Sequence, residues 1–96
     1  KALHQASLTP MKILKNSAYA MTLLDELSGK CSKLILSDVV TGAALLAASA
    51  HGGFINVGAN TGLMKNIEIA QKFNEEAKML LSQTMKLHDS ISQLMS

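Results

Sequence analysis

The chain has 96 residues, of which 48% are hydrophobic and only 3% aromatic, so its length allows at most one small domain, spanning residues 1–96. Its nine basic residues are all Lys and outnumber seven acidic residues, which gives a net charge of +2. The lack of Arg and the scarcity of stacking aromatics argue against a dedicated nucleic-acid binder.

The single cysteine, Cys31, excludes an internal disulfide and any cysteine-based metal site. The three histidines, His4, His51 and His88, lack the spacing of metal ligands, so we expect no metal. One unpaired cysteine and no visible secretory signal favour the cytoplasm. Because the chain begins at Lys1 within a polar-apolar pattern, we expect it to be part of a longer protein or a fragment left after cleavage. The alternative is a complete chain that packs as an oligomer.

The first helix is predicted from Pro10 to about Ser28. Thr9 is a suitable N-cap, and Pro10 would occupy the first helical position, where its missing N–H costs nothing. Residues 1–7 would then be the end of a preceding helix or a frayed terminus. Gly29 is suited to the position just after the helix.

A second helix is predicted to begin at Ser37 or Asp38 and to continue through Ala59. Ser37 or Asp38 would cap it, and the Asp38 carboxylate would favour the positive end of the helix dipole. From Val39 to Met64 the chain carries no formal charge and is rich in Ala and Gly. The pair Gly52-Gly53 indicates a bend or a place where another backbone comes close.

An uncharged segment of this length belongs either in a bilayer or in a protein core. Its small residues suit membrane helices. His51, Asn56 and Asn60, together with the lack of aromatic belts and of a cluster of basic residues at one end, favour a core helix. We therefore expect no membrane contact.

A third helix is predicted from about Asn66 almost to the C-terminus. Steps of three and four residues along one face form a seam typical of a long helix in a bundle. The seam consists of Ala70, Phe73, Ala77, Leu80, Thr84, Leu87, Ile91 and Leu94.

These elements predict an all-α fold, a bundle of long antiparallel helices with a central small-residue helix. Three helices can hardly cover a central one on every side. We therefore expect missing helices or a partner subunit to complete the bundle, and a homodimer formed through helices that include the small-residue one.

In its order of elements the chain resembles the cyclodeaminase domain of the formiminotransferase-cyclodeaminase family, which includes stand-alone methenyltetrahydrofolate cyclohydrolases. The resemblance rests on Ser37-Asp38, the Ala/Gly run, Asn56-Val57 with Asn60, and a long charged helix from Lys65 onward. It extends over nearly the whole chain and corresponds to the C-terminal half of that domain. The Thr9-Pro10 step is similar to the start of a helix in the family.

The resemblance implies an enzyme of one-carbon metabolism that acts on a tetrahydrofolate derivative without a metal. The reaction would be closure of 5-formiminotetrahydrofolate to 5,10-methenyltetrahydrofolate with loss of ammonia, or the related cyclohydrolase reaction. The candidate folate-binding residues are Asn56, Asn60, Asp38 and Ser37, and the catalytic residues are not identified. The family's N-terminal portion, with its glycine-rich loop and an acidic residue, lies outside these residues, so a missing N-terminal segment would complete the active site.

Each candidate residue also has a structural interpretation. Asn56 and Asn60 lie four apart and share a helix face, where amides can orient a pterin or tie neighbouring helices together. Asp38 can be a simple N-cap beside Ser37. His51 can be a general base, or a buried histidine with satisfied hydrogen bonds.

Two departures favour an alternative function. Family members commonly place a basic residue between the two asparagines and a Lys after the second, where this chain has Gly58 and Gly62. The alternative is a non-catalytic relative of the family, a helical bundle that acts as an oligomerisation or interaction module.

Overall fold

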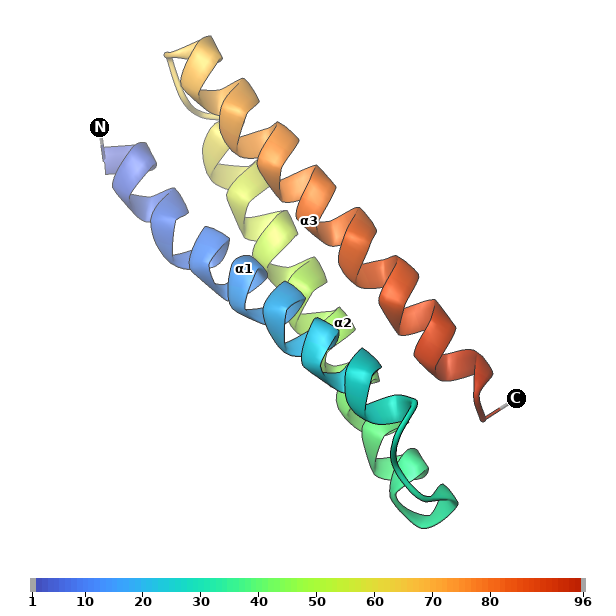
Figure 1. The fold of residues 1–96 in the computed structure, drawn as a ribbon. Coiled ribbons are helices and arrows are strands. Elements are labelled where there is room, and N and C mark those ends of the chain that lie inside the picture. The colour runs from blue at the N-terminus through green and yellow to red at the C-terminus, as the bar shows by residue number, and fades with distance from the viewer. Residues whose placement is uncertain (1, 96) are drawn as a thin grey trace.

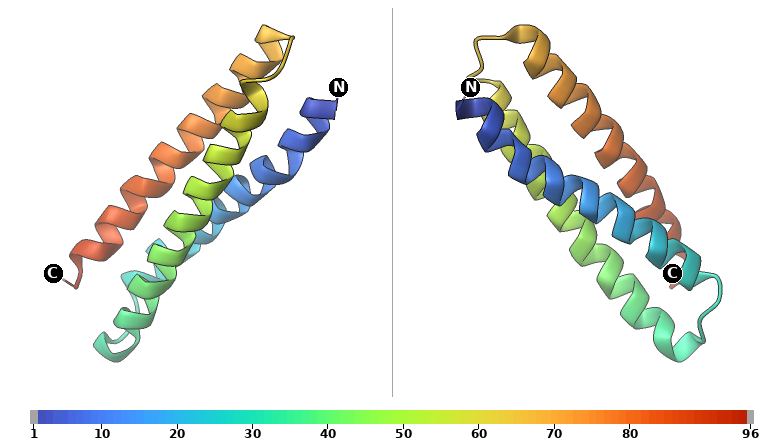
Figure 2. Two further views of the ribbon diagram at one scale, coloured as in Figure 1. Left: turned by 180° about the vertical axis from the view of Figure 1, so that it is seen from behind. Right: turned by 60° about the vertical axis from the view of Figure 1, so that its left-hand side comes forward.

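The computed structural model describes residues 2–95, which form three helices. They are α1 (Ala2–Ser28), α2 (Lys33–Thr61) and α3 (Ile67–Gln93). The helices run down, up and down along a rod of 50 × 17 × 17 Å, and each packs against the other two (Figure 1). Both connections are short, so consecutive helices are antiparallel and lie side by side (Figure 2). The predicted all-α bundle is confirmed.

The predicted start of the first helix at Pro10 is wrong, because α1 continues through Pro10 from Ala2. A proline inside a helix leaves the carbonyl four residues earlier without its backbone donor. That carbonyl belongs to Ala6, and it accepts a hydrogen bond from Asn60 Nδ2 of α2 at 3.2 Å. Tertiary contact therefore supplies the bond that the proline removes.

The predicted cap of the second helix is also wrong. Ser32 is the N-cap residue, with an extended backbone, and α2 begins at Lys33. Nothing between Lys33 and Leu36 breaks a helix, so the helix extends one turn before Ser37 and Asp38. Both side chains are exposed on the helix surface.

The third helix begins as predicted. Asn66 is its N-cap, and its Oδ1 accepts a hydrogen bond from the backbone N–H of Ile69 at 3.1 Å. The seam faces the other helices, since Ala70, Ala77, Thr84 and Ile91 are buried. Leu94, which ended the predicted seam, lies just after α3 and is 52% exposed.

Close contact between α1 and α2 depends on Gly53. A Cβ atom at Gly53 would lie 2.8 Å from the carbonyl oxygen of Pro10 and 3.3 Å from the backbone nitrogen of Leu14. Backbone atoms cannot move aside easily, so only glycine allows this approach. A hydrogen bond of 3.0 Å from Ser17 Oγ to Ser49 Oγ joins the same two helices further along.

The core lies along the bundle axis in two adjoining clusters. Leu14, Ala50 and Val57 are fully buried near one end, and Met21 and Ala43 near the other. The outer side of α2, in contrast, is not covered by α1 or α3, and Leu45 and Ile55 there are 69% and 61% exposed. By length and composition α2 could cross a bilayer, a test that core helices of soluble proteins also pass. Completion of the bundle by further helices or a partner stays a prediction.

Candidate functional site

The two asparagines predicted to bind a ligand lie together beside Pro10. They line a groove of about 300 Å³ between α1 and the C-terminal part of α2. The groove is lined by Ala6, Thr9, Pro10, Ile13, Asn56, Ala59 and Asn60. We call it the proline groove.

The two amides in the proline groove differ in the hydrogen-bonding groups that remain free for a ligand. Asn60 uses Nδ2 to hold the Ala6 carbonyl, which leaves its Oδ1 as an acceptor on the groove. Asn56 is exposed, and its side chain makes no hydrogen bond to another of the described residues. Its amide can therefore present donors and an acceptor to one edge of a bound molecule. The structural interpretation thus holds for Asn60, and the ligand-binding interpretation remains open to Asn56.

The walls of the proline groove are apolar apart from these amides and the Thr9 hydroxyl. Pro10, Ile13 and Ala59 provide the apolar contacts. An apolar slot with a few amide and hydroxyl groups suits a flat, polar-edged heterocycle. Sequence reasoning missed Thr9 and Pro10 as groove residues, because it placed them at a helix start. The signal that could have found them is the unpaired carbonyl that a proline inside a helix creates.

Ser37 and Asp38 do not join the asparagines. They lie near the opposite end of α2, and the rise of a helix separates Asp38 from Asn56 by about 27 Å. One copy of the chain therefore cannot gather all four candidates around one small molecule.

The described residues offer no obvious general acid or base in the proline groove, since none of its lining residues titrates near neutral pH. His51, predicted as a possible general base or a buried histidine, is exposed and is not among the groove residues. Within residues 2–95, no three His, Cys, Asp or Glu side chains gather into a group that could hold a metal ion.

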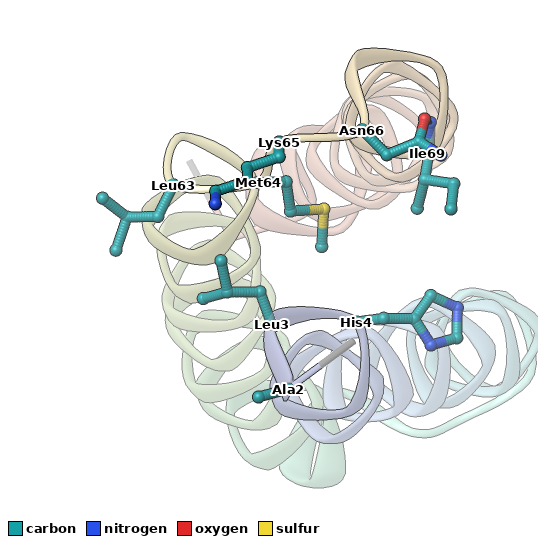
Figure 3. Close-up of a pocket in the computed structure, with 8 residues that line it drawn as sticks. All are labelled: Ala2, Leu3, His4, Leu63, Met64, Lys65, Asn66 and Ile69. Carbon is teal, nitrogen blue, oxygen red and sulfur yellow. The ribbon is translucent and has the colours of Figure 1, made fainter.

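A second cleft, of about 440 Å³, lies at the end of the bundle where α1 starts and α2 turns into α3. Figure 3 shows Met64 and Ile69 pointing into the gap above α1, while Leu63 points away from it. His4 stands at its edge, with its ring 5.3 Å from that of Phe73 in an edge-on arrangement. The cleft is mainly apolar and lacks the paired amides of the proline groove.

Comparison with known protein families identifies the chain. The family model described as formiminotransferase-cyclodeaminase matches residues 1–79. The chain belongs to the formiminotransferase-cyclodeaminase family. The match covers α1, α2 and the first half of α3, and so includes the whole proline groove. No curated protein and no solved structure matches the chain.

Family membership gives the proline groove a context. The resemblance stated from the sequence is confirmed at the level of the family, and it indicates a folate-related cyclodeaminase domain. The departures at Gly58 and Gly62 lie on or just after α2, and both glycines are exposed to solvent. Neither glycine can supply a positive charge to the proline groove.

Proposed function

We propose that the chain takes part in folate-dependent one-carbon metabolism in the cytoplasm and that the proline groove holds the pterin of a tetrahydrofolate derivative. The observation that carries the proposal is the free Asn56 amide beside the Asn60 Oδ1 in an apolar slot, within a chain of the formiminotransferase-cyclodeaminase family. Amides match the donor and acceptor edge of a pterin, and Pro10 and Ile13 would contact its ring face.

The proposed reaction is cyclisation of 5-formiminotetrahydrofolate to 5,10-methenyltetrahydrofolate with release of ammonia, or the related opening of the methenyl compound by water. Both pass through a tetrahedral carbon between two nitrogens of the folate and require proton transfer. Asn56 and Asn60 would orient the ring. Because no groove residue can transfer the proton, the acid–base group would come from a further N-terminal segment of the protein or from a partner subunit.

Binding of folates to the protein that contains this chain tests this function. We expect isothermal titration calorimetry to detect binding of 5-formyl- or 5,10-methenyltetrahydrofolate. Removing the amide in Asn56→Ala should weaken binding about tenfold or more, the effect of losing a hydrogen bond or two. Gln71→Ala removes an exposed amide from α3 and serves as the matched control. Absence of binding by the unsubstituted protein, or equal binding by both variants, contradicts the proposal.

The alternative is a non-catalytic relative that serves as an interaction module. The exposed apolar side of α2 favours it, because surfaces of this kind mark sites of contact with another protein. Release of ammonia from 5-formiminotetrahydrofolate, or loss of the methenyltetrahydrofolate absorbance, by the protein that contains this chain would exclude the alternative.

A further inference from the structure

Three polar side chains near the C-terminal end of α3 are linked by hydrogen bonds. Ser92 Oγ lies 3.3 Å from His88 Nε2, and His88 Nδ1 lies 3.1 Å from Asp89 Oδ1. His88 and Ser92 are four residues apart, so they are neighbours on one face of the helix. All three residues come after residue 79, where the match to the family model ends, so family membership does not account for them.

The hydrogen bonds fix the role of each group. An ionised carboxylate can only accept, so Nδ1 of His88 carries the hydrogen in its bond to Asp89. In a neutral imidazole the other nitrogen, Nε2, is then a bare acceptor, and the Ser92 hydroxyl donates to it. A hydroxyl, a bare imidazole nitrogen and a carboxylate in this order are the parts of an activated nucleophile, its general base and the group that orients the base.

The three groups are held in place without being sealed inside the bundle. Ile91, which is 1% exposed, anchors this part of α3 in the core, and the Ser92 carbonyl accepts a hydrogen bond from the N–H of Met95 at 3.2 Å. The His88 side chain is 22% exposed, so part of its ring is packed and part faces solvent. Ser92 is likewise only partly buried. A small molecule can therefore reach the hydroxyl without displacing a helix.

The surroundings of Ser92 indicate which substrate it can use. Ser92 lies in the last turn of α3, where the backbone N–H groups donate to carbonyls within the helix. They cannot stabilise the negative charge that develops on a carbonyl oxygen under attack. The leaving group must therefore depart easily, as the phenolate of an aryl ester does. Met95, three residues after Ser92 and 52% exposed, offers an apolar contact to a short acyl group.

We propose that Ser92 is a nucleophile that accepts a short acyl group from an activated ester, with His88 as its general base and Asp89 as the positioning residue. The Ser92 oxygen bonds to the acyl carbon, and the bond from that carbon to the leaving oxygen breaks. The leaving group departs as an anion with the bonding electron pair, while the Ser92 proton passes to His88 Nε2 and from there to water. The product is an O-acylated Ser92. This inference goes beyond the proposed folate chemistry and does not depend on it.

Acetylation by p-nitrophenyl acetate tests the nucleophile. The protein that contains this chain is mixed with the ester, quenched in acid and digested with trypsin, which cleaves after Lys86 and leaves Ser90 and Ser92 on one peptide. Ser90 is exposed on the same helix and takes no part in these hydrogen bonds, so it is an internal control. We expect fragment mass spectrometry to show Ser92 acetylated about a hundredfold faster than Ser90, the lower end of what a positioned general base contributes. Equal acetylation of the two serines, or none at Ser92, overturns the proposal.

A variant of His88 tests the general base. His88→Gln keeps a polar side chain that can bond to the Ser92 hydroxyl but cannot take up its proton. Acetylation of Ser92 should therefore fall to the rate of Ser90, while circular dichroism shows retained helix. Undiminished acetylation in this variant contradicts the role of His88.

The position of the ring hydrogen tests the role of Asp89. Nitrogen-15 NMR of the unsubstituted protein should place the hydrogen of neutral His88 on Nδ1. In Asp89→Asn the amide can also donate to Nδ1, so both tautomers should be present and acetylation of Ser92 should fall about tenfold. A hydrogen on Nε2 in the unsubstituted protein, or unchanged acetylation in Asp89→Asn, overturns the assignment of Asp89.

Discussion

At the scale of single residues, the feature that most affects the first two helices is the pairing of Pro10 with Asn60. Asn60 was predicted to bind a ligand or to tie helices together. Its Nδ2 lies 3.2 Å from the Ala6 carbonyl, the group that Pro10 deprives of a backbone donor. The two residues thus act together, because the Asn60 side-chain amide replaces the backbone N–H that Pro10 lacks.

This pairing predicts coupling between the two positions. Asn60→Ala should lower the free energy of unfolding by about 1 kcal/mol, because the Ala6 carbonyl loses its donor. In a Pro10→Ala background, the new N–H of residue 10 can bond to that carbonyl, so the same change should cost only a few tenths of a kcal/mol. Urea unfolding of the four proteins at one concentration measures the coupling.

Asn56→Ala is the control for this cycle, since Asn56 lies one turn earlier on α2 and lines the same groove. We expect it to change stability by less than about 0.5 kcal/mol in both backgrounds. An equal loss on removing Asn60 with and without the proline would show that the two residues act independently.

At the scale of elements, two glycines of α2 differ in their relation to α1. Gly53 faces the Pro10 carbonyl at 2.8 Å from its hypothetical Cβ, whereas Gly58 on the same helix has open space. The same substitution should therefore have opposite effects at the two positions.

Gly53→Ala should destabilise the fold by about 1–3 kcal/mol, because the added methyl group forces the two backbones apart. Gly58→Ala should stabilise it by about 0.5–1 kcal/mol, because alanine restricts the unfolded chain and favours a helix. Chemical denaturation of both variants at one concentration gives the sign of each effect. Stabilisation by both would mean that α1 and α2 are less closely packed than described.

Element boundaries show where sequence patterns succeed and where they fail. The cap at Asn66 and the seam of α3 were predictable, because capping and helical periodicity depend on residues close in sequence. The starts of α1 and α2 were not. The carbonyl that Pro10 leaves without a backbone donor is that of Ala6, and its donor is Asn60, a residue 54 positions after Ala6. Ser37 and Asp38 have the chemistry of caps, but the helix continues back to Lys33.

The candidate site was predictable only in part for the same reason. Spacing alone placed Asn56 and Asn60 on one helix face, and the structure confirms that they share a groove. No pattern within α2 could show that Thr9 and Pro10 of α1 form its other wall. Nor could it show that Ser37 and Asp38, on the same helix, lie too far away to take part.

At the scale of the whole molecule, the thinness of the rod determines how the chain can be stable. A chain of 96 residues folded into three helices has a narrow core, and large apolar side chains such as Leu34 and Leu45 remain exposed. Association of two copies through the exposed side of α2 would bury Leu45 and add stability that depends on protein concentration.

Thermal unfolding should therefore shift with concentration. Each tenfold dilution of a dimer reduces its stability by about 1.4 kcal/mol. The melting temperature measured by circular dichroism should therefore fall when the protein is diluted roughly a hundredfold, from about 200 to about 2 μM. Leu45→Asp places a charge on the exposed outer side of α2 and should melt at one temperature throughout that range. Superimposable melting curves for the unsubstituted chain would show that it unfolds as a monomer.

The bond between Asn60 and the Ala6 carbonyl also has a consequence for the order of assembly. In an ordinary helix this carbonyl would accept a hydrogen bond from the backbone N–H four residues later. In α1 its donor is the side chain of a residue 54 positions later in the sequence. The segment before Pro10 therefore becomes a complete helix only after the far end of α2 has docked. Its amide protons should be among the last to gain protection from exchange during folding, and local opening should begin there.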